Sequence, residues 1–411
     1  MLKLDDYTLI VGESAINELR LLAMSLRGKT IQHVNSAKVG GGVAEILNRM
    51  VPLAQDLELD IRWDVIKGDN GFFQVTKKFH NALHGHPEKI TKRDFEIFMA
   101  TGQKNIKEFE ITGDIVFIHD PQPITLIKTR SSHPKKKWAW RCHIDISRAN
   151  EKVWKFLRQF VIKYDATVFH SAIFTRDLPN PQFLIPPSID PLSDKNKELS
   201  PEYINQVMAK HKIPRDKPII SQFSRYDYMK DPIGVIETYR LVKKYHDCRL
   251  ILSGGAASDD PEGAKILADT KERAGHDPDV HLLLMPPGTD TEVNALQRGS
   301  DIIIQKSLRE GFALSVTEAL WKSKPVVASA VGGIPLQVID GYSGLLCHSI
   351  EGAAFKIKEL LSNPDYARQL GKNAREHVRQ NFLLTRHLRN HLLLFLSLYH
   401  DSNMIQLTHQ G

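Results

Sequence analysis

Short apolar segments recur along the whole chain, and each is followed by Gly, Pro or polar residues and then by a helical pattern. Each segment has about the length of a buried strand. Strands that are covered by helices on both faces of a parallel sheet form such continuous apolar runs. The segments lie at residues 30–34, 114–118, 138–143 and 166–169 in the first half, and at 218–223, 249–255, 280–284, 301–305 and 325–329 in the second. This repetition predicts an α/β protein with two doubly wound sheets.

The length of 411 residues also favours two domains, because a single hydrophobic core usually stops growing at roughly 250 to 300 residues. Between the two sets of segments lies Leu184–Pro191, whose three prolines exclude a helix and would interrupt a central strand. We place the interdomain hinge there and expect closure about Pro186–Pro191. The predicted domains are residues 1–186 and 187–385, and a helical, apolar segment over 386–411 is expected to pack back on the first domain.

Charge and cysteine usage limit the partners and the compartment. The formal net charge is +7, yet the one short basic run, Lys135–Lys137, lacks the aromatic interleaving of a nucleic-acid platform, so no nucleic-acid partner is expected. Three widely spaced cysteines fit neither a disulfide framework nor a metal motif. The N-terminus lacks a secretory pattern, and no stretch reaches the ~20 apolar residues that span a bilayer. We expect a cytoplasmic protein without membrane contact, whose positive charge suits a diphosphate-bearing small molecule.

The strongest chemical signal is the segment Ser307–Leu320, which follows the predicted strand at 301–305 and opens a helix. A helix that begins near Leu314 or Ser315 points free backbone N–H groups and its positive dipole end toward a ligand, which suits a diphosphate. Gly311 allows a ligand to approach the backbone closely.

Two carboxylates accompany this helix start. Glu318 comes eight residues after Glu310. A carboxylate accepts hydrogen bonds from two hydroxyls, so that the pair suits the vicinal diols of a hexose and a ribose. The alternative is an acidic residue that stabilises the start of the helix.

The spacing of Glu310 and Glu318, with Gly-Phe-Ala-Leu between them, resembles the E-x7-E signature of retaining nucleotide-sugar glycosyltransferases with the GT-B fold. In that fold, two Rossmann-like doubly wound domains face a deep cleft. The resemblance implies that Glu310 contacts hydroxyls of the donor sugar and that Glu318 contacts the ribose. It also implies that the backbone amides at Leu314 and Ser315 bind the donor phosphates.

A second segment, Phe223–Pro232, places Arg225 and Lys230 on a loop after a predicted strand. A planar guanidinium and a compact ammonium suit a departing diphosphate, although such a pair alone usually belongs to a solvated loop. The resemblance implies that both cations neutralise the donor phosphates. It also implies that Gly254, at the end of the next strand, lets the nucleotide pass nearby.

In the first half, Gly41 lies in the turn Val39–Glu45, which lacks the G-x-G-x-x-G order of a dinucleotide fingerprint. A backbone free of side chains can approach a phosphate or an acceptor sugar closely. The alternative is a flexible turn between a strand and a helix.

Polar residues also follow two strands of the first half. Asp120 and Gln122 come after the strand at 114–118 and are candidates for binding an acceptor hydroxyl, the alternative being a proline-rich strand exit. His143 ends the strand at 138–143, and the carboxyl ends of strands face the ligand crevice in open α/β sheets. The resemblance implies that His143 contacts the donor sugar near the reacting centre.

The resemblance becomes more specific over the full length of the chain. The chain resembles the trehalose glycosyltransferring synthases of archaea and thermophiles in the stretch from Leu4 to Gly42, the Asp120 segment and Trp138–Ser147. The related trehalose phosphorylases share the architecture of these synthases. The resemblance implies reversible transfer of glucose from ADP- or UDP-glucose to glucose, forming α,α-trehalose with retained configuration. No bound cofactor is implied, and the lack of an Asp-x-Asp motif gives no reason to expect a metal. We also expect a homodimer.

Alternatives remain within and outside this enzyme class. The chain could be a trehalose phosphorylase, a glucosyltransferase with another acceptor such as fructose 6-phosphate or a glucan, or a catalytically silent nucleotide-sugar-binding protein. The joint presence of the four candidate catalytic residues argues against the silent protein; these are His143, Arg225, Lys230 and Glu310. The missing fingerprint disfavours a dinucleotide-dependent dehydrogenase.

Overall fold

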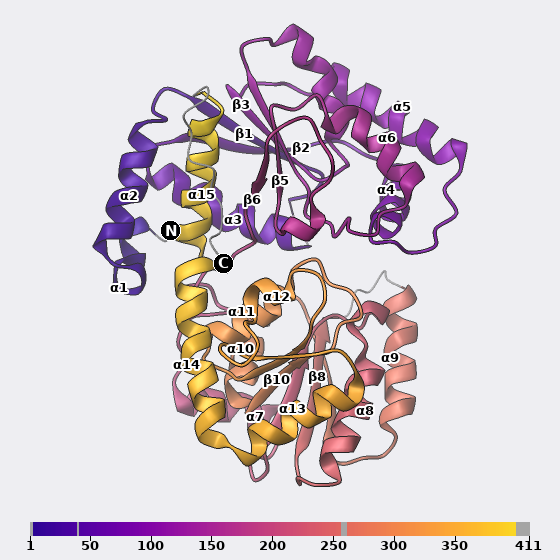
Figure 1. The fold of residues 1–411 in the computed structure, drawn as a ribbon, viewed down its shortest axis with the longest axis vertical. Coiled ribbons are helices and arrows are strands. Elements are labelled where there is room, and N and C mark those ends of the chain that lie inside the picture. Colours follow the sequence, from indigo (N-terminus) through magenta and orange to yellow (C-terminus); the bar gives the residue numbers. More distant parts are fainter. Residues whose placement is uncertain (1–2, 39–40, 256–260, 400–411) are drawn as a thin grey trace. The chain divides into compact units, whose positions relative to one another are not determined.

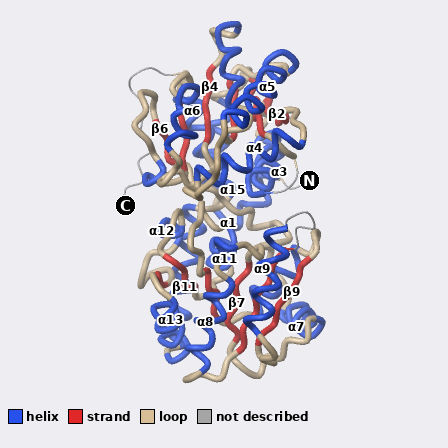
Figure 2. Tube along the Cα trace, turned by 90° about the vertical axis from the view of Figure 1, so that its right-hand side faces the viewer, coloured by secondary structure: helices blue, strands red, loops and turns tan. Residues whose placement is uncertain are grey.

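The computed structural model describes residues 3–38, 41–255 and 261–399. The chain forms two compact units (Figure 1). The first contains the described residues of Met1–Ser188 and of Leu384–Gly411, and the second contains those of Ile189–Leu383. Each unit is a parallel sheet with helices on both faces (Figure 2).

The sheet of the first unit has the strand order β2-β1-β3-β4-β5-β6, and all neighbours are parallel. Its strands are β1 (Thr30–Asn35), β2 (Asp60–Val65), β3 (Ile115–His119), β4 (Lys137–Arg141), β5 (Ala166–Phe169) and β6 (Gln182–Leu184). The order runs outward from β1 in one direction and from β3 in the other. The sheet therefore has a topological switch point between β1 and β3, where open α/β sheets bind ligands.

Helices cover both faces of this sheet (Figure 1). One face carries α4 (Asn70–Leu83), α5 (Lys92–Glu108) and α6 (Glu151–Val161), and the other carries α2 (Glu13–Met24), α3 (Gly41–Asp56) and α15 (Leu384–Ser397), with α1 (Thr8–Val11) leading into α2. The last helix has an apolar stripe at helical spacing, and this stripe is buried in the first unit. Its residues Leu384, Leu388, Leu392 and Phe395 are buried, and the helix packs on α2 and α3.

The second unit has the strand order β12-β11-β10-β7-β8-β9, again with parallel neighbours. Its strands are β7 (Ile219–Phe223), β8 (Arg249–Gly255), β9 (Val280–Met285), β10 (Ile302–Gln305), β11 (Val326–Ser329) and β12 (Leu345–Cys347). One face of this sheet carries α8 (Pro232–Lys243), α9 (Pro261–Ala274) and α13 (Ile350–Ser362). The other face carries α7 (Pro201–Lys210), α10 (Asp290–Gly299), α11 (Leu314–Trp321) and α14 (Pro364–Asn381). The helix α12 (Ile334–Gln337) is a single short turn. The switch point lies between β7 and β10.

The predicted fold class, two doubly wound parallel sheets, is confirmed, and every strand predicted from an apolar segment forms. Three further strands, β2, β6 and β12, lie at sheet edges and are not predicted. β2 alternates charged and apolar residues because one side of an edge strand meets water. β6 and β12 have only three residues each, too few for a pattern.

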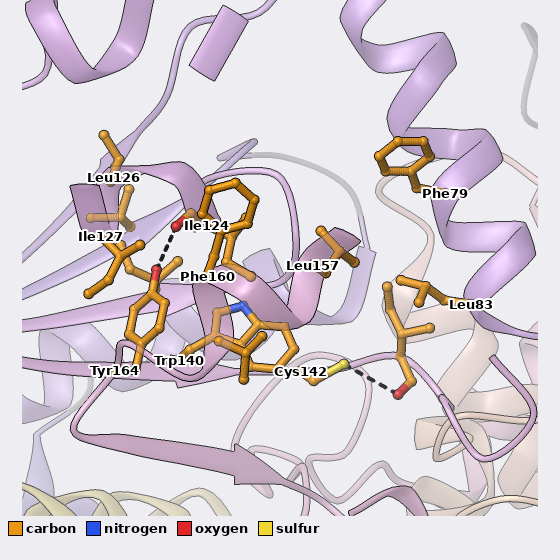
Figure 3. Packing of buried hydrophobic residues seen from close by; sticks show 14 of the residues in the cluster. Phe79, Leu83, Ile124, Leu126, Ile127, Trp140, Cys142, Leu157, Phe160 and Tyr164 are labelled. Atoms are coloured by element: carbon orange, nitrogen blue, oxygen red, sulfur yellow. Dashed lines mark hydrogen bonds between the residues drawn. The ribbon is translucent and has the colours of Figure 1, made fainter. Parts of the chain in front are cut away.

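The core of the first unit packs aromatic side chains against the sheet (Figure 3). Tyr164 donates a hydrogen bond from its hydroxyl to the carbonyl oxygen of Ile124 at 2.9 Å, which pairs a buried phenol. Cys142 lies in the same core, and burial raises the pKa of its thiol well above the ordinary value. All three cysteines are buried and free. None of the helices in the described part of the chain combines the length and apolar character that membrane crossing requires.

Candidate active site

In the second unit, the candidate donor-binding residues other than Gly254 follow β7 and β10, the two strands at the switch point. Lys230 lies in the 3-10 helix η4 (Tyr228–Lys230) after β7, and its Nζ is 2.5 Å from Oε2 of Glu310, which follows β10. Ser307 donates from its hydroxyl to the same Oε2 at 3.0 Å. The side chains of Lys230 and Glu310 are 20% and 8% exposed, so that the ion pair is largely withdrawn from water. The hydrogen bonds of Glu310 within the described residues involve Oε2 and leave Oε1 without one.

A directed chain of hydrogen bonds links Glu310 to the first turn of α11. Ser315 donates from its hydroxyl to Oε1 of Gln305 at 3.1 Å, and the Gln305 amide donates to the hydroxyl oxygen of Ser307 at 2.8 Å. Ser307 then donates to Glu310. Gln305 and Ser307 are each 1% exposed. The carboxylate and the helix start are therefore held in one buried network.

The loops after β7 and β10 are tied to each other. The side-chain amide of Gln222, near the end of β7, donates to the carbonyl oxygen of Lys230 at 2.8 Å and its Oε1 accepts from the backbone N–H of Lys306 at 2.8 Å. Nζ of Lys306 is 3.2 Å from Asp231, the N-cap of α8. These contacts fix Lys230 relative to Glu310 before any ligand arrives.

The helix α11 begins at Leu314, as predicted, and Ser315 is its second residue. The first turn of a helix leaves N–H groups without intrahelical partners and carries the positive end of the helix dipole. Ala313 precedes the helix in the left-handed region with φ of 70°. The side-chain amide of Gln337 donates to the carbonyl oxygen of Phe312 just before this turn and so holds it in place.

Glycine is required beside this turn. Gly332 has φ of +56°, and a Cβ atom there would lie 1.6 Å from the carbonyl oxygen of Glu310. The neighbouring Gly333 donates from its backbone N–H to the carbonyl oxygen of Gly311 at 3.1 Å. The loop after β11 thus supports the backbone that carries Glu310.

Three further candidates occupy different environments. Arg225 is 60% exposed after β7 and contacts Asp227 at 3.4 Å. Gly254 is the penultimate residue of β8, and a Cβ atom there would lie 2.2 Å from the carbonyl oxygen of Ser224, so that the packing of this strand end requires glycine. Glu318 is 7% exposed within α11.

Lys322 lies one turn beyond Glu318 and is also buried. Its Nζ donates to the carbonyl oxygen of Glu318 at 3.2 Å and to Oδ1 of Asn196 at 3.0 Å. Burial lowers the pKa of Lys322 to about 7, and the charge of Glu318 opposes that change. Lys322 is not predicted as a site residue, because a lysine at the end of a helix is common for structural reasons alone.

In the first unit, His143 lies two residues beyond the end of β4 rather than within the strand. Its backbone N–H donates to Oδ1 of Asp120 at 2.7 Å. Asp120 follows β3 with φ of 63°, and its carbonyl oxygen accepts from the indole N–H of Trp140 at 2.9 Å. Burial raises the pKa of Asp120 to about 7, although the hydrogen bond from His143 and the charge of Arg141 act to lower it.

The remaining candidates of the first unit are Gln122 and Gly41. Oε1 of Gln122 is buried and has no hydrogen-bond partner within the described residues, which is costly unless a ligand supplies one. Gly41 is the first residue of α3, so that the helix begins inside the segment Val39–Glu45 that was predicted as a turn. The preceding residues of that turn, Val39 and Gly40, lie outside the described residues.

Comparison with known proteins decides the family. Residues 33–176 match the family Trehalose synthase, N-terminal domain, and residues 204–377 match Glycosyl transferases group 1. A trehalose synthase of Thermococcus litoralis is 45% identical over 401 residues, covering 96% of this chain and 97% of that protein. The chain belongs to the trehalose synthase family of glycosyltransferases. A trehalose synthase of Rubrobacter xylanophilus is 43% identical over 96% of this chain and 97% of that protein.

More distant relatives place the family among its neighbours. A trehalose phosphorylase of Pleurotus pulmonarius is 29% identical over 91% of this trehalose synthase family member, but the match covers only 58% of that longer protein. Among solved structures, a sucrose-phosphate synthase of Thermosynechococcus elongatus has a TM-score of 0.70 at 17% identity, covering 91% of this chain and all of that one. An α,α-trehalose-phosphate synthase (UDP-forming) of Burkholderia xenovorans has a TM-score of 0.69 at 14% identity, with 91% and 100% covered. These structures support the GT-B fold.

Several residues that shape this glycosyltransferase site are not predicted from the sequence. Gln222, Gln305 and Gln337 stand inside or beside apolar segments, where they resemble isolated polar interruptions. The Gly332-Gly333 pair, which follows the strand at 325–329 after two residues, is the one recognisable sign, because glycines near a strand end often mark close backbone approach. In the described part of the chain, no group of three or more His, Cys, Asp or Glu side chains is arranged to hold a metal ion.

Proposed function

We propose that the protein transfers a glucosyl group from ADP- or UDP-glucose to glucose, forming α,α-trehalose with retained configuration in a reversible reaction. The observation that supports this most is the buried Lys230–Glu310 pair at the switch point of the second unit, joined by hydrogen bonds to the start of α11. It combines an anion-binding helix start with a cation and a hydroxyl-binding carboxylate, the groups that a nucleotide sugar needs.

The donor would be bound by the second unit. Oε1 of Glu310 would accept from a hydroxyl of the glucosyl group, while the backbone amides at Leu314 and Ser315 bind the diphosphate. Arg225 is exposed and near the end of β7, where a mobile guanidinium can close on a phosphate. Glu318 would accept from the ribose, and Gly254 would leave space for the nucleotide.

Acceptor and donor-sugar contacts would come from the first unit. Asp120 and Gln122 follow β3 beside the switch point, and Oε1 of Gln122 is a buried acceptor without a partner that an acceptor hydroxyl would satisfy. His143 would contact the glucosyl group, and Gly41 at the start of α3 would approach the diphosphate or the acceptor through its backbone.

The chemistry would be electrostatic. Cleavage of the bond between the anomeric carbon and the diphosphate builds negative charge on the leaving group, and Lys230, Arg225 and the start of α11 would stabilise it. Glu310 is already engaged by Lys230 and Ser307, so that it serves binding rather than nucleophilic attack. The departing diphosphate would take the proton of the acceptor hydroxyl on the same face of the sugar, which accounts for retention without a second carboxylate.

Product analysis tests this proposal directly. The full chain would be incubated with glucose and each of several nucleoside diphosphate glucoses, and the products would be identified by mass spectrometry and enzymatic hydrolysis. Trehalose together with the matching nucleoside diphosphate is the expected result. A different disaccharide, or free glucose from donor hydrolysis alone, would overturn the assignment of acceptor.

A phosphorylase reaction is the second candidate, supported by the similarity to fungal trehalose phosphorylases. Incubation of trehalose with inorganic phosphate would then release glucose and glucose 1-phosphate. Incubation of trehalose with a nucleoside diphosphate would instead produce a nucleotide sugar if the reversible synthase reaction is correct. The two reactions are distinguished by which anion is consumed.

A further inference from the structure

Three histidines of the first unit form a row across neighbouring strands. His33 lies on β1, His119 ends β3, and His143 follows β4. Nδ1 of His33 is 2.9 Å from Nε2 of His119, and Nδ1 of His119 is 3.0 Å from Nε2 of His143. The rings are stacked in sequence, with centroid separations of 5.2 and 5.3 Å. Hydrogen bonds between ring nitrogens therefore connect all three.

The row is closed off from water at the His33 end. His33 and His119 are 0% and 2% exposed, while His143 is partly exposed. Phe117 and Phe395 pack against the His33 ring at centroid distances of 5.2 and 6.0 Å. Burial lowers the pKa of His33 to about 3 and those of His119 and His143 well below the ordinary value. Each ring is thus neutral at physiological pH, with one nitrogen that donates and one that accepts.

Two neutral arrangements satisfy both hydrogen bonds. The protons are donated either from His33 toward His143 or from His143 toward His33. The first leaves a lone pair on Nε2 of His33, and the second leaves an N–H group there. That nitrogen is buried and has no hydrogen-bond partner within the described residues. The positive charge of Arg141 acts on all three rings and does not distinguish the two arrangements.

Buried backbone N–H groups without an acceptor are rarer in proteins than carbonyl oxygens without a donor, and we apply the same asymmetry to the buried Nε2 of His33. The first arrangement is therefore the more stable one. His119 then donates from Nδ1 to Nε2 of His143 and accepts at Nε2 from His33. The ring of His143 is left with its own proton on Nδ1.

We propose that His119 and His33 are positioning residues that hold His143 in the neutral tautomer protonated on Nδ1, so that it presents an N–H donor to a hydroxyl oxygen of a hexose. Nδ1 of His143 makes no hydrogen bond within the described residues and is the partly exposed end of the row. Asp120 holds the backbone of His143 independently, through its N–H group. The hexose contact rests on the proposed function, whereas the tautomer does not.

The tautomer can be measured without substrate. The full chain would be labelled with ¹⁵N-histidine, and the signals of His143 would be assigned by their loss in His143→Asn. Long-range ¹H–¹⁵N correlations report which ring nitrogen carries the proton. A protonated Nδ1 and an unprotonated Nε2 are expected in the unliganded protein. Protonation on Nε2, or on both nitrogens at neutral pH, would overturn the proposal even if the protein makes trehalose.

Two variants of His119 separate hydrogen bonding from packing. His119→Gln supplies an amide N–H to His143 and a carbonyl oxygen to His33, so that the tautomer and turnover should persist. His119→Phe keeps a ring but removes both hydrogen bonds, so that His143 should no longer hold its proton on Nδ1 alone and should populate both neutral tautomers. If the proposed transfer occurs, kcat should fall about tenfold with little change in KM, the factor that one hydrogen bond of ordinary strength contributes.

His387→Phe is the matched control, because His387 is another buried histidine of the same unit whose Nδ1 contacts the carbonyl oxygen of Pro186 at 2.8 Å. It should leave the His143 tautomer unchanged. An unchanged tautomer in His119→Phe would overturn the positioning role. The wild-type spectrum and His119→Gln decide the matter if His119→Phe does not fold.

Discussion

At the scale of a single residue, mutation of Arg225 should affect activity but not the stability of the fold. Its side chain is 60% exposed and contacts Asp227 at 3.4 Å, a surface pair of little energetic weight. Arg225→Ala should therefore change the free energy of unfolding by less than about 0.5 kcal/mol. If the guanidinium binds the departing diphosphate, kcat/KM should fall about 100-fold.

Steady-state kinetics and urea unfolding of the same preparation would check both expectations. Arg215→Ala is the control, because Arg215 is also exposed but precedes β7 and contacts Asn205. It should keep full activity. Equal turnover in Arg225→Ala and the wild type would remove Arg225 from the site.

Asp120 gives a second prediction, in the pH dependence of stability. Its pKa is raised from 3.8 to about 7 in the folded protein. Between these values the folded state binds more protons at Asp120 than the unfolded state does, so that stability falls as the pH rises. The loss from this residue reaches up to about 4 kcal/mol above pH 7.

Asp120→Asn lacks this titration, while its amide oxygen can still accept from the backbone N–H of His143. The variant should therefore gain stability relative to the wild type as the pH rises from 4.5 to 8. Chemical unfolding at both pH values measures the difference, and all other titrating groups cancel between the two proteins. A difference that does not vary with pH would show that Asp120 is ionised normally.

The site residues that follow strands were predicted from the sequence, whereas the residues that fix their positions through contacts were not. Glu310 and Lys230 are recognisable because charged residues near the end of a strand or the start of a helix are candidates for ligand binding. Their contact at 2.5 Å joins positions 80 residues apart and could not be read from spacing. The same holds for His33 and His119, which the sequence shows only as polar interruptions of apolar strands.

At the scale of elements, two loops meet where Gly332 approaches the carbonyl oxygen of Glu310. Gly332→Ala would force both a residue with a Cβ into φ of +56° and a backbone contact at 1.6 Å. The loops must separate, which should displace Glu310. Activity should fall at least about 100-fold, and stability should fall by about 2 kcal/mol or more, because overpacking adds to strain.

Gly341→Ala tests the effect of backbone strain at a positive φ without a steric clash of the added Cβ atom. Gly341 has φ of +75°, yet a Cβ atom there would meet only the Tyr366 hydroxyl at 4.0 Å. This variant should lose about 1 kcal/mol and keep its activity. Thermal unfolding and turnover of the two variants provide the comparison, and equal losses of activity would contradict a supporting role for the loop after β11.

The elements themselves were largely predictable. Central strands carry uninterrupted apolar runs because helices cover both of their faces, and all of these were predicted. Among the edge strands, β9 was also predicted from its apolar run, whereas β2 was not because it exposes Asp60 and Arg62 to water. The start of α11 was predictable from Gly311 and the apolar run after it, but the left-handed Ala313 before it was not, because alanine has no preference for that conformation.

At the scale of the whole molecule, the chain leaves the first unit after β6 and returns to it as α15. This path places Phe395, which is 1% exposed, against His33 and Phe117 of the first sheet. We predict from the sequence that this helix packs back on the first domain, although an apolar stripe by itself fits either core. The division of the chain into units assigns it to the first.

Phe395→Ala tests that assignment. Loss of a buried phenyl group should destabilise by about 3 to 5 kcal/mol. The effect should be confined to the first unit, since each unit has its own core. Hydrogen exchange should accelerate in β1 and β3 and stay unchanged in β7 and β10. Phe355→Ala on α13 is the control, because Phe355 is 61% exposed and its loss should alter neither unit. Faster exchange in β7 and β10 of Phe395→Ala would instead mean that α15 stabilises the second unit, so that the two cores do not unfold independently.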